Sequence, residues 1–512
     1  MMGVQRPRVL LVTPPYHSGV VESAGVWMPL HFAYLAGHAR GAGAEVRIYD
    51  AMSQCHTHED IAREIESFRP DIVATTAITA MEPDAREICR TAKRLNPGIL
   101  TVMGNVHPTF CWRPILAEDP HVDVVVRGEG ETTFAELIEA YRSAGNIETI
   151  SGIAYRKDGH PAATPPRPFS SLDSRIAAWD LIEWSQYYYR PHPEGHLAIV
   201  NSSRGCRQHC SFCSQQKFWA RSWRGRDAAA FVTEIEMLRD KYDVRVAMLS
   251  DETPTVDADR WERILDLLIE RRVGVELLME TRVDDILRDE AILSKYVEAG
   301  ISHIYVGVES TDQTVLDFYQ KDTKVAQSKR AIELINAHDI ISETSFVLGT
   351  LEETTASIDT TLEVAKWYAP DMAFFLALTP WPYADIFPAL EEHIATTDYR
   401  RYNLVEPVVK PLTMTIDEVR AALHRATGRF FRDKFERLGT LSPAKRTFMI
   451  SVLKLLIERS YLGKEMRAMA GQASMPESVK KMVRELGITL PAMDTLTTGV
   501  RGTRTNQDRA RY

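Results

Sequence analysis

Short apolar runs alternate with amphipathic stretches along most of this 512-residue chain. In the first block the apolar runs span residues 9–12, 45–49, 72–76, 100–103 and 122–126. In the stretch over 60–68, Ile61, Ile65 and Phe68 recur at helical spacing. Strands that are apolar throughout and separated by helices are typical of a parallel sheet covered on both faces. We therefore expect a doubly wound, Rossmann-like α/β domain over residues 7–155.

A second block of alternation follows a proline-rich stretch. Residues 156–189 hold several prolines, among them Pro165 and Pro166, and the absence of periodicity there predicts a linker. Within the next expected domain, residues 190–390, an amphipathic helix follows each of the first five apolar runs. The runs span residues 197–201, 244–249, 275–280, 303–308, 343–348 and 372–378. Such units predict a partial or complete (β/α) barrel whose active site lies on the loops after the strands.

The chain becomes mainly helical after residue 390. We expect a helical region over 391–496, with helices at 416–437, 443–461 and 477–486, and a flexible, Arg-rich tail over 497–512. The helix at 443–461 carries an apolar face with basic side chains nearby. Packing in a core is the favoured interpretation, and contact with a membrane surface is the alternative.

Composition limits the partners and the compartment. The chain has 61 Lys and Arg against 70 Asp and Glu, a net charge of −9, which gives no electrostatic reason to expect a nucleic acid partner. No apolar run approaches the ~18 residues of a membrane-spanning helix, and the first run is too short for a signal peptide. Six cysteines in a chain of this length do not form a disulfide framework. We expect a cytoplasmic protein.

Three cysteines lie directly after the first strand of the second block. Cys206, Cys210 and Cys213 are separated by three and then two residues. A structural zinc site needs four ligands, typically in two separated pairs, and His209 is awkwardly placed beside Cys210. Thiolates also hold iron–sulfur clusters, and a four-iron cluster on three thiolates keeps one iron open. Because the loop lies where the active site of a barrel belongs, the cluster is favoured over zinc or a chance grouping.

The strand ends of the first block carry small residues and glycines. Ligands of doubly wound sheets bind outside the carboxyl ends of the strands, and glycines allow a backbone to approach a large ligand closely. The residues at these ends are Thr75, Thr76, Gly104, Asn105, Gly128, Glu129 and Gly130. A bound cofactor and simple tight turns explain this pattern equally well.

The Cys-x₃-Cys-x₂-Cys loop resembles that of the radical S-adenosylmethionine (SAM) superfamily. The resemblance implies a barrel of the partial, six-stranded type and a [4Fe-4S] cluster held by the three cysteines. It also implies that SAM binds the open iron, and that one electron cleaves it to a 5′-deoxyadenosyl radical. No catalytic residue beyond the cofactor ligands is implied.

The same resemblance implies which residues contact SAM. Phe212 matches an aromatic position beside the adenine, and Glu252 in Ser-Asp-Glu stands where the family has Gly-Gly-Glu, near the methionine ammonium. Arg282 and Glu309 occupy positions of ribose and carboxylate contacts, although each could instead form a buried ion pair. Gly349 belongs to a segment that resembles the adenine-packing motif of the fifth strand.

The first block resembles the cobalamin-binding domain that often precedes such a barrel. The implied cobalamin contacts are Ser18 and the strand-end residues named above. Domains of the methionine-synthase kind carry Asp-x-His-x-x-Gly, and here Met52 stands where the histidine would be. Solvated or capping roles suit the nearby His56 and His58 better than ligation. We therefore expect no histidine below the cobalt.

Several segments resemble the anaerobic magnesium-protoporphyrin IX monomethyl ester oxidative cyclases of bacteriochlorophyll biosynthesis. These segments are residues 16–19, 127–131, 213–219 and 379–382, although Gln216 stands where a tryptophan is expected. The resemblance implies oxygen-independent cyclisation of a magnesium porphyrin ester to divinyl protochlorophyllide, with water as the oxygen source. It also implies a tetrapyrrole substrate and a low-potential electron donor of the flavodoxin or ferredoxin type.

Two other functions remain open at this point. A cobalamin-dependent radical methyltransferase, acting on a tetrapyrrole or another unactivated carbon, would need the same cofactors. A non-catalytic cobalamin or redox sensor would bind them without cleaving SAM. Five aromatic residues could either face a porphyrin or pack in the core: Phe218, Trp219, Trp223, Trp381 and Tyr383.

Overall fold

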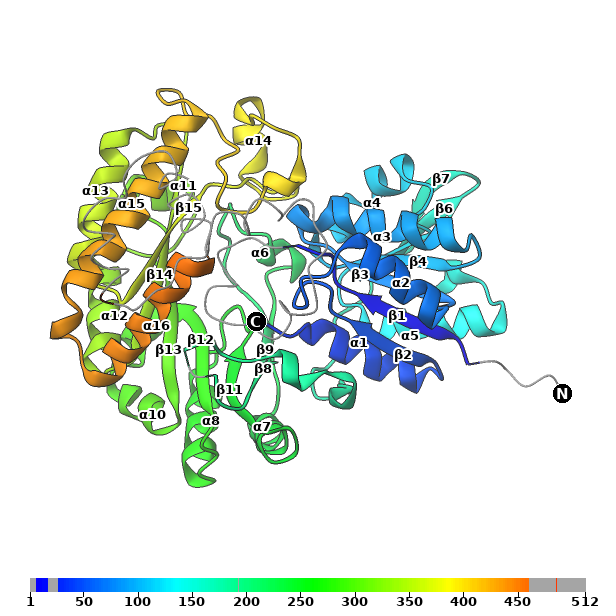
Figure 1. Cartoon of the computed structure of the whole chain (residues 1–512), viewed down its shortest axis with the longest axis horizontal. Coiled ribbons are helices and arrows are strands. Elements are labelled where there is room, and N and C mark those ends of the chain that lie inside the picture. Colours follow the sequence, from blue (N-terminus) through cyan, green and yellow to red (C-terminus); the bar gives the residue numbers. More distant parts are fainter. Residues whose placement is uncertain (1–5, 17–25, 192, 460–484, 486–512) are drawn as a thin grey trace.

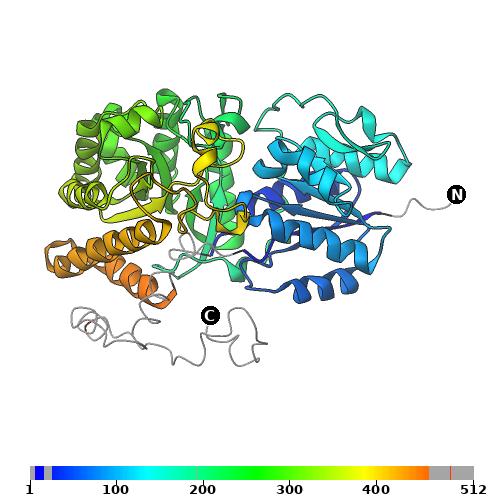
Figure 2. The same ribbon diagram turned by 90° about the horizontal axis from the view of Figure 1, so that it is seen from above.

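The computed structural model describes residues 6–16, 26–191, 193–459 and 485. Two α/β bodies lie side by side, and two C-terminal helices, α15 (Ile416–Glu436) and α16 (Pro443–Arg459), pack against the second body (Figures 1 and 2). Ser18, the tail over 497–512 and, apart from Glu485, the helix expected over 477–486 lie outside the described residues.

The first body is built on a sheet with the order β2-β1-β3-β4-β5-β6-β7. Its first five strands are parallel, as predicted. They are β1 (Arg8–Val12), β2 (Glu45–Tyr49), β3 (Ile72–Thr76), β4 (Leu100–Gly104) and β5 (Val124–Val126). Every residue of β3 is buried, which fits a strand covered on both sides.

Helices cover both faces of this sheet. The helices α1 (Leu30–Gly41) and α5 (Glu131–Ser143) share one apolar cluster with the sheet. The helices α2 (His58–Phe68) and α3 (Glu82–Leu95) share another. A third cluster contains α4 (Val106–Glu118). The doubly wound prediction is confirmed.

An antiparallel hairpin extends the edge of the sheet. It consists of β6 (Ile153–Lys157) and β7 (His160–Ala163), so β7 lies within the stretch expected to be a linker. Periodicity could not reveal β7 because it is a short, partly exposed edge strand, where a proline is tolerated. Further along the same stretch, Trp179, Trp184 and Tyr187 are buried against the second body.

The second body is a six-stranded parallel sheet with the order β15-β14-β13-β12-β11-β8, curved into a partial barrel (Figure 1). Its strands are β8 (His196–Val200), β11 (Val244–Leu249), β12 (Glu276–Arg282), β13 (Ile301–Gly307), β14 (Ile341–Leu348) and β15 (Met372–Ala377). Helices such as α7 (Ala228–Tyr242) and α8 (Ala258–Glu270) connect consecutive strands. The predicted six-stranded partial barrel is confirmed.

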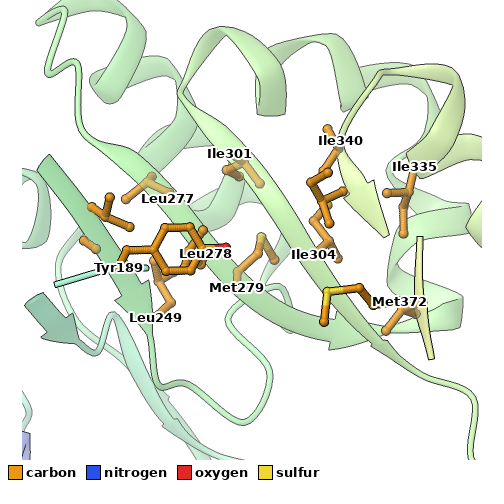
Figure 3. Close-up of a cluster of buried hydrophobic side chains, with 14 of the residues drawn as sticks. Tyr189, Leu249, Leu277, Leu278, Met279, Ile301, Ile304, Ile335, Ile340 and Met372 are labelled. Atoms are coloured by element: carbon orange, nitrogen blue, oxygen red, sulfur yellow. The ribbon is translucent and has the colours of Figure 1, made fainter. Parts of the chain in front are cut away.

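Apolar side chains from adjacent strands fill the core of this barrel. Figure 3 shows Leu278 and Met279 of β12 lying between Leu249 of β11 and Ile301 and Ile304 of β13. Each of these side chains is at most 3% exposed. This packing fixes the strands whose carboxyl ends carry the polar residues described below.

The helix α16 packs on the barrel. Its Phe448, Met449 and Val452 belong to the barrel core, and the Lys445 Nζ donates to the buried Asp371 Oδ2 at 2.6 Å. The interpretation of this segment as a core helix is confirmed. Within the described part of the chain, no helix combines the length and the apolar character needed to cross a bilayer.

Candidate functional site

A cavity lies between the two bodies. It holds about 1380 Å³ of space including its open mouth. The strand ends of the first sheet and the start of α1 line one side, and the ends of β8 and β11 with α6 (Gln215–Phe218) line the other. The described residues expected to contact cobalamin all line this cavity: Thr75, Thr76, Gly104, Asn105, Gly128, Glu129 and Gly130.

The wall on the side of the first sheet is preformed. The Thr75 hydroxyl donates to the Val12 carbonyl at 2.9 Å, and the Asn105 amide donates to the Thr76 hydroxyl at 2.8 Å. Gly128 adopts φ +73°, and a Cβ atom there would meet no atom within 4 Å. Because Gly128 has no side chain, this space stays open to a ligand. The wall can therefore accept a large, flat ligand such as a corrin ring.

The cysteine loop lies between β9 (Ser203–Gly205) and α6. The strand β9 pairs with β10 (Trp223–Gly225), so a short ladder closes the base of the loop. Gly205, directly before Cys206, adopts φ +104°, and a Cβ atom there would lie 2.1 Å from the Ser222 carbonyl oxygen. Both facts require glycine at this position.

Backbone hydrogen bonds hold the rest of the loop. The Ser211 N–H donates to the Tyr319 carbonyl at 2.8 Å, and the Ile386 N–H donates to the Ser211 carbonyl at 2.9 Å. The Phe212 ring packs edge-on against Tyr319 at 5.0 Å between centroids. Among the described residues, no group of three or more His, Cys, Asp and Glu side chains could hold a single metal ion.

Glu252 follows β11 and lines the cavity. Its Oε2 accepts from the Gly205 N–H at 2.9 Å, and its Oε1 accepts from the Trp219 indole N–H at 2.6 Å. Burial raises the pKa of Glu252, although the hydrogen bonds from these two donors act to lower it. The adjacent Asp251 faces the other way, where Ser202 and Ser203 donate to it. Of this pair, only Glu252 is available to the cavity.

The other residues expected to contact SAM lie at the carboxyl ends of later strands. Glu309 adopts φ +64° and accepts from the Lys321 Nζ at 2.8 Å, so the described residues form the buried ion pair that was the alternative expectation. Arg282 donates to the partly exposed Asp284 at 3.0 Å. Gly349 adopts φ +97°, and its N–H donates to Glu353 at 3.0 Å. Their roles toward SAM stay predictions.

A carboxyl group inside the barrel was not identified from the sequence. Glu280 lies on β12, and burial, reinforced by the neighbouring Glu252 and Glu343, raises its pKa from 4.5 to about 8. Glu280 is therefore protonated at neutral pH. The sequence around Glu280 does not indicate whether its side chain faces the inside of the barrel or the outer helices.

Of the five aromatic residues that could face a porphyrin, Phe218 and Trp219 line the cavity. Trp223 lies outside it and donates its indole N–H to the Thr253 carbonyl at 3.0 Å. Tyr383 bonds to the Thr79 hydroxyl at 3.0 Å, Trp381 packs against a separate apolar cluster, and neither residue lines the cavity. Tyr383 is buried, whereas Trp223 and Trp381 are partly exposed.

Buried ion pairs join the two bodies beside the cavity. Glu129 and Glu131 of the first body face Arg204 of β9, with distances of 3.0 Å and 2.8 Å. Arg175 also pairs with both carboxylates, and Arg224 of β10 lies 2.8 Å from Glu129. Burial alone would raise the pKa of Glu131, but Arg204 and Arg175 outweigh it and hold that pKa at about 2. Glu129 thus contributes to this network as well as to the wall of the cavity.

Among the described residues, one histidine lines the cavity, and no motif pointed to it. It is His31, in the first turn of α1. The two histidines considered from the sequence lie outside the cavity lining: His56 bonds to the Tyr49 hydroxyl at 2.5 Å, and His58 lies 3.1 Å from Asp84. Met52 does not line the cavity either.

Comparisons with known proteins match both bodies. A family model of the B12 binding domain matches residues 16–138, and a model of the radical SAM superfamily matches residues 200–365. An anaerobic magnesium-protoporphyrin IX monomethyl ester cyclase of Rubrivivax gelatinosus is 37% identical over 462 residues, which cover 89% of this chain and 83% of that protein.

Two further relatives extend the comparison. An uncharacterized methyltransferase of Pyrococcus horikoshii is 30% identical over 444 residues, which cover 84% of this chain and 95% of that protein. Among solved structures, the cobalamin-dependent SAM radical enzyme OxsB with aqua-cobalamin and SAM bound has a TM-score of 0.66. That match covers 99% of this chain and 83% of OxsB at 15% sequence identity, so it indicates a shared fold.

Proposed function

The chain belongs to the B12-binding radical SAM enzymes, and from this premise we propose that it is an anaerobic oxidative cyclase. Its cofactors are cobalamin, a [4Fe-4S] cluster and SAM. The substrate would be magnesium-protoporphyrin IX 13-monomethyl ester, and the product divinyl protochlorophyllide. Balanced, the reaction consumes one water, releases six electrons and six protons, and forms the isocyclic ring with its keto group.

The observation that carries the proposal is the similarity to the cyclase of Rubrivivax gelatinosus. At 37% identity it covers 89% of this chain, so the similarity cannot be confined to either body alone. A shared barrel alone would not support a substrate. The lining of the cavity between the bodies also supports the proposal, because Phe218 and Trp219 place aromatic surface where a flat macrocycle could lie.

In this proposal each of the two bodies holds a different cofactor. Residues 7–155 would hold cobalamin at the strand ends, and residues 190–390 would hold the cluster on Cys206, Cys210 and Cys213. When bound, the cluster and SAM supply radical abstraction of hydrogen from a C–H bond that no side-chain base can ionise. A low-potential protein of the flavodoxin or ferredoxin type would donate the electron that starts each cleavage. The oxidant would be SAM itself, because three molecules reduced to methionine and 5′-deoxyadenosine take up the six electrons.

The chain's own residues would position and shield the reactants. Glu252 would accept a hydrogen bond from the methionine ammonium of SAM. The Gly205 N–H and the Trp219 indole N–H would hold the Glu252 carboxylate in place. Phe218 and Trp219 would exclude water from one face of the macrocycle. Glu280, protonated at neutral pH, lies on the neighbouring strand β12 as a group able to hold a proton inside the barrel.

A cobalamin-dependent methyltransferase is the second candidate. The observation that favours it is the Pyrococcus horikoshii relative, which is 30% identical over 84% of this chain. The two candidates differ in product composition. The cyclase product gains one oxygen and loses four hydrogens relative to the substrate, whereas methylation adds one carbon and two hydrogens.

The test is anaerobic turnover of the reconstituted protein with SAM, cobalamin, a low-potential reductant and magnesium-protoporphyrin IX monomethyl ester. Mass spectrometry of the pigment is the readout, with 5′-deoxyadenosine measured in parallel. We expect the cyclised composition. A methylated pigment would replace the cyclase with the methyltransferase, and unchanged pigment with abundant 5′-deoxyadenosine would overturn the proposed substrate.

A further inference from the structure

A polar row crosses the inner face of the barrel. Its members are Glu280 of β12, Tyr305 of β13 and Glu343 of β14, which are direct partners in the register of these strands. Partners in a parallel sheet project from the same side. His303, two residues before Tyr305, is linked through the register of β12 and β11 to Ile199 of β8, which lines the cavity. The row therefore faces the interior of the barrel, below the cavity.

Hydroxyl groups connect the row to the carboxyl ends of the strands. The Ser345 hydroxyl donates to the Glu309 Oε2 at 3.3 Å. Because that hydroxyl has one proton, the Tyr305 hydroxyl, which lies 2.5 Å away, donates to Ser345. Glu309 lies just past the end of β13, among the residues expected to contact SAM. A chain of hydrogen bonds thus joins the row to the level at which the radical chemistry is expected.

A histidine extends the row toward the amino ends of the strands. The His303 Nε2 lies 2.7 Å from the Glu343 Oε2, although the N–H does not point straight at that oxygen. The His303 Nδ1 lies 3.3 Å from the Tyr189 hydroxyl. Burial and, after it, Glu276 raise the pKa of Tyr189, and Glu276 lines a hollow at the amino ends of the strands. Groups able to carry protons therefore extend from one end of the barrel interior to the other.

The carboxyl groups of the row can exchange a proton near neutral pH. Burial raises the pKa of Glu280 from 4.5 to about 8, and nearby carboxylates reinforce this effect: Glu252, Glu343, Asp251 and Glu309. A group whose pKa lies near the working pH both takes up and gives up a proton readily. Glu280, Tyr305 and Glu343 are each only partly buried, so water can reach the row.

The proposed cyclase reaction needs an exit for protons, whereas methylation does not. Of the six hydrogens removed from substrate and water, three leave as hydrogen atoms on 5′-deoxyadenosine. The other three leave as protons, and their electrons replace those that cleaved the three SAM molecules. Methylation of an unactivated carbon places one hydrogen atom on 5′-deoxyadenosine and takes a methyl group from a second SAM, so it releases no proton.

We propose that Glu343 and His303 relay protons along the inside of the barrel, away from the reaction site. The inference rests on the proposed cyclase function, because only that reaction releases protons. Glu280 and Tyr305 deliver protons to Glu343, and Tyr189 passes them from His303 to solvent at the amino end. Only O–H and N–H bonds form and break along this route, and no electron is transferred.

The experiment is anaerobic turnover of the reconstituted full chain with SAM, cobalamin, a low-potential reductant and magnesium-protoporphyrin IX monomethyl ester, in ordinary and in deuterated water. Glu343→Gln and His303→Gln keep the size of each side chain and remove its titration. Glu343→Asp keeps a titrating carboxyl group. The control is His58→Gln, because His58 also lies beside a carboxylate, that of Asp84, but on the first body.

We expect Glu343→Gln and His303→Gln to form the first equivalent of 5′-deoxyadenosine at the unsubstituted rate, because hydrogen abstraction precedes proton release. Cyclised pigment should form on the order of 100-fold more slowly, as for loss of a general base. The solvent isotope effect should rise, because proton release then limits the rate. Glu343→Asp should recover most of the rate, and His58→Gln should match the unsubstituted chain.

Infrared titration of the chain without substrate gives a readout that does not depend on turnover. A carboxylic acid band that persists to about pH 8 and is absent from Glu280→Gln would identify Glu280. In Glu343→Gln this band should titrate at lower pH, because a neighbouring negative charge has been removed. An unchanged titration would show that the two carboxyl groups do not interact, and would overturn the relay.

The turnover results separate the relay from the cyclase function. Cyclisation at the full rate in Glu343→Gln, or slow cyclisation with an unchanged solvent isotope effect and no recovery in Glu343→Asp, would overturn the relay alone. If Glu343→Gln does not fold, His303→Gln provides the same comparison. A methylated pigment from the unsubstituted chain would overturn the cyclase function and the relay together.

Discussion

The carboxylate of Glu252 accepts a hydrogen bond from the indole N–H of Trp219 at 2.6 Å. Its other oxygen accepts from the backbone of Gly205 at 2.9 Å. Gly205 directly precedes Cys206, and Trp219 follows Cys213. One partly buried side chain, just after the second barrel strand, therefore holds both ends of the cysteine loop and also faces the cavity.

Replacing Glu252 should separate its binding role from its structural role. We expect Glu252→Gln to weaken SAM binding about 10- to 100-fold, because a hydrogen bond to a charged group contributes ~1.5–3 kcal/mol. The amide still offers an oxygen to one donor, so iron–sulfur absorbance should remain. Equilibrium dialysis with SAM is the measurement, and Glu270→Gln on the outer helix α8 is the control. Unchanged affinity in Glu252→Gln would remove this residue from the SAM site.

The cluster assignment predicts a sharp contrast among the cysteines. Replacing Cys206, Cys210 or Cys213 with alanine should abolish iron–sulfur absorbance and 5′-deoxyadenosine formation together, because three thiolates are needed. The control variants replace the cysteines outside the loop, Cys55, Cys89 and Cys111. These should keep most of both signals. An essential role in cluster binding for any control cysteine would show that the assignment is wrong.

Gly205→Ala should disrupt the loop without removing a ligand. The new Cβ would lie 2.1 Å from the Ser222 carbonyl oxygen, in a backbone with φ +104°. Strain of this kind costs about 1–3 kcal/mol before the steric clash is counted. We expect substantially less iron per protein after reconstitution. Gly428→Ala, on α15 with no atom within 4 Å of the new Cβ, should reconstitute normally. Equal iron content in both variants would contradict the role given to Gly205.

Glu131 should make the junction between the bodies sensitive to acid. Its pKa is depressed in the fold from 4.5 to about 2. Its contribution to the free energy of unfolding is therefore present above pH ~4.5 and lost as the pH falls toward 2. The pKa shift corresponds to about 3 kcal/mol of that free energy. We expect Glu131→Gln to lower thermal stability at pH 7, and the difference from the unsubstituted chain to shrink by pH 3. A difference that does not depend on pH would refute the depressed pKa.

Glu280 should have the opposite pH dependence. Its pKa is raised in the fold from 4.5 to about 8, so the fold favours the protonated form. Its contribution to stability is therefore present below pH ~4.5 and lost progressively as the pH rises through 8. We expect Glu280→Gln to unfold at a higher temperature than the unsubstituted chain at pH 8.5, with little difference at pH 5. Parallel melting curves at both values would contradict this.

Sequence reasoning located the strand ends well because parallel strands end at one edge. Thr75, Gly104 and Gly128 are far apart in the chain, yet the order β3-β4-β5 brings them to one cavity. Periodicity was equally sufficient for the six barrel strands. Both inferences depend only on local pattern and on the geometry of a parallel sheet.

The remaining features depend on packing between segments distant in sequence. His31 belongs to no motif, and only the approach of α1 to the barrel places it in the cavity. Arg175 lies in the stretch expected to be a linker, and no pattern around it in the sequence predicts its ion pair with Glu129. Aromatic composition could not separate Trp219, which lines the cavity, from Tyr383, which packs against Thr79.

The most direct test of the proposed cyclase is anaerobic turnover in oxygen-18 water. Water is the only oxygen source in the proposed reaction, so the new keto oxygen should carry the label at nearly the enrichment of the solvent. The ester and carboxylate oxygens serve as internal controls because they predate the reaction. A cyclised product with an unlabelled keto group would contradict the proposed chemistry, and a methylated product would contradict the proposed function.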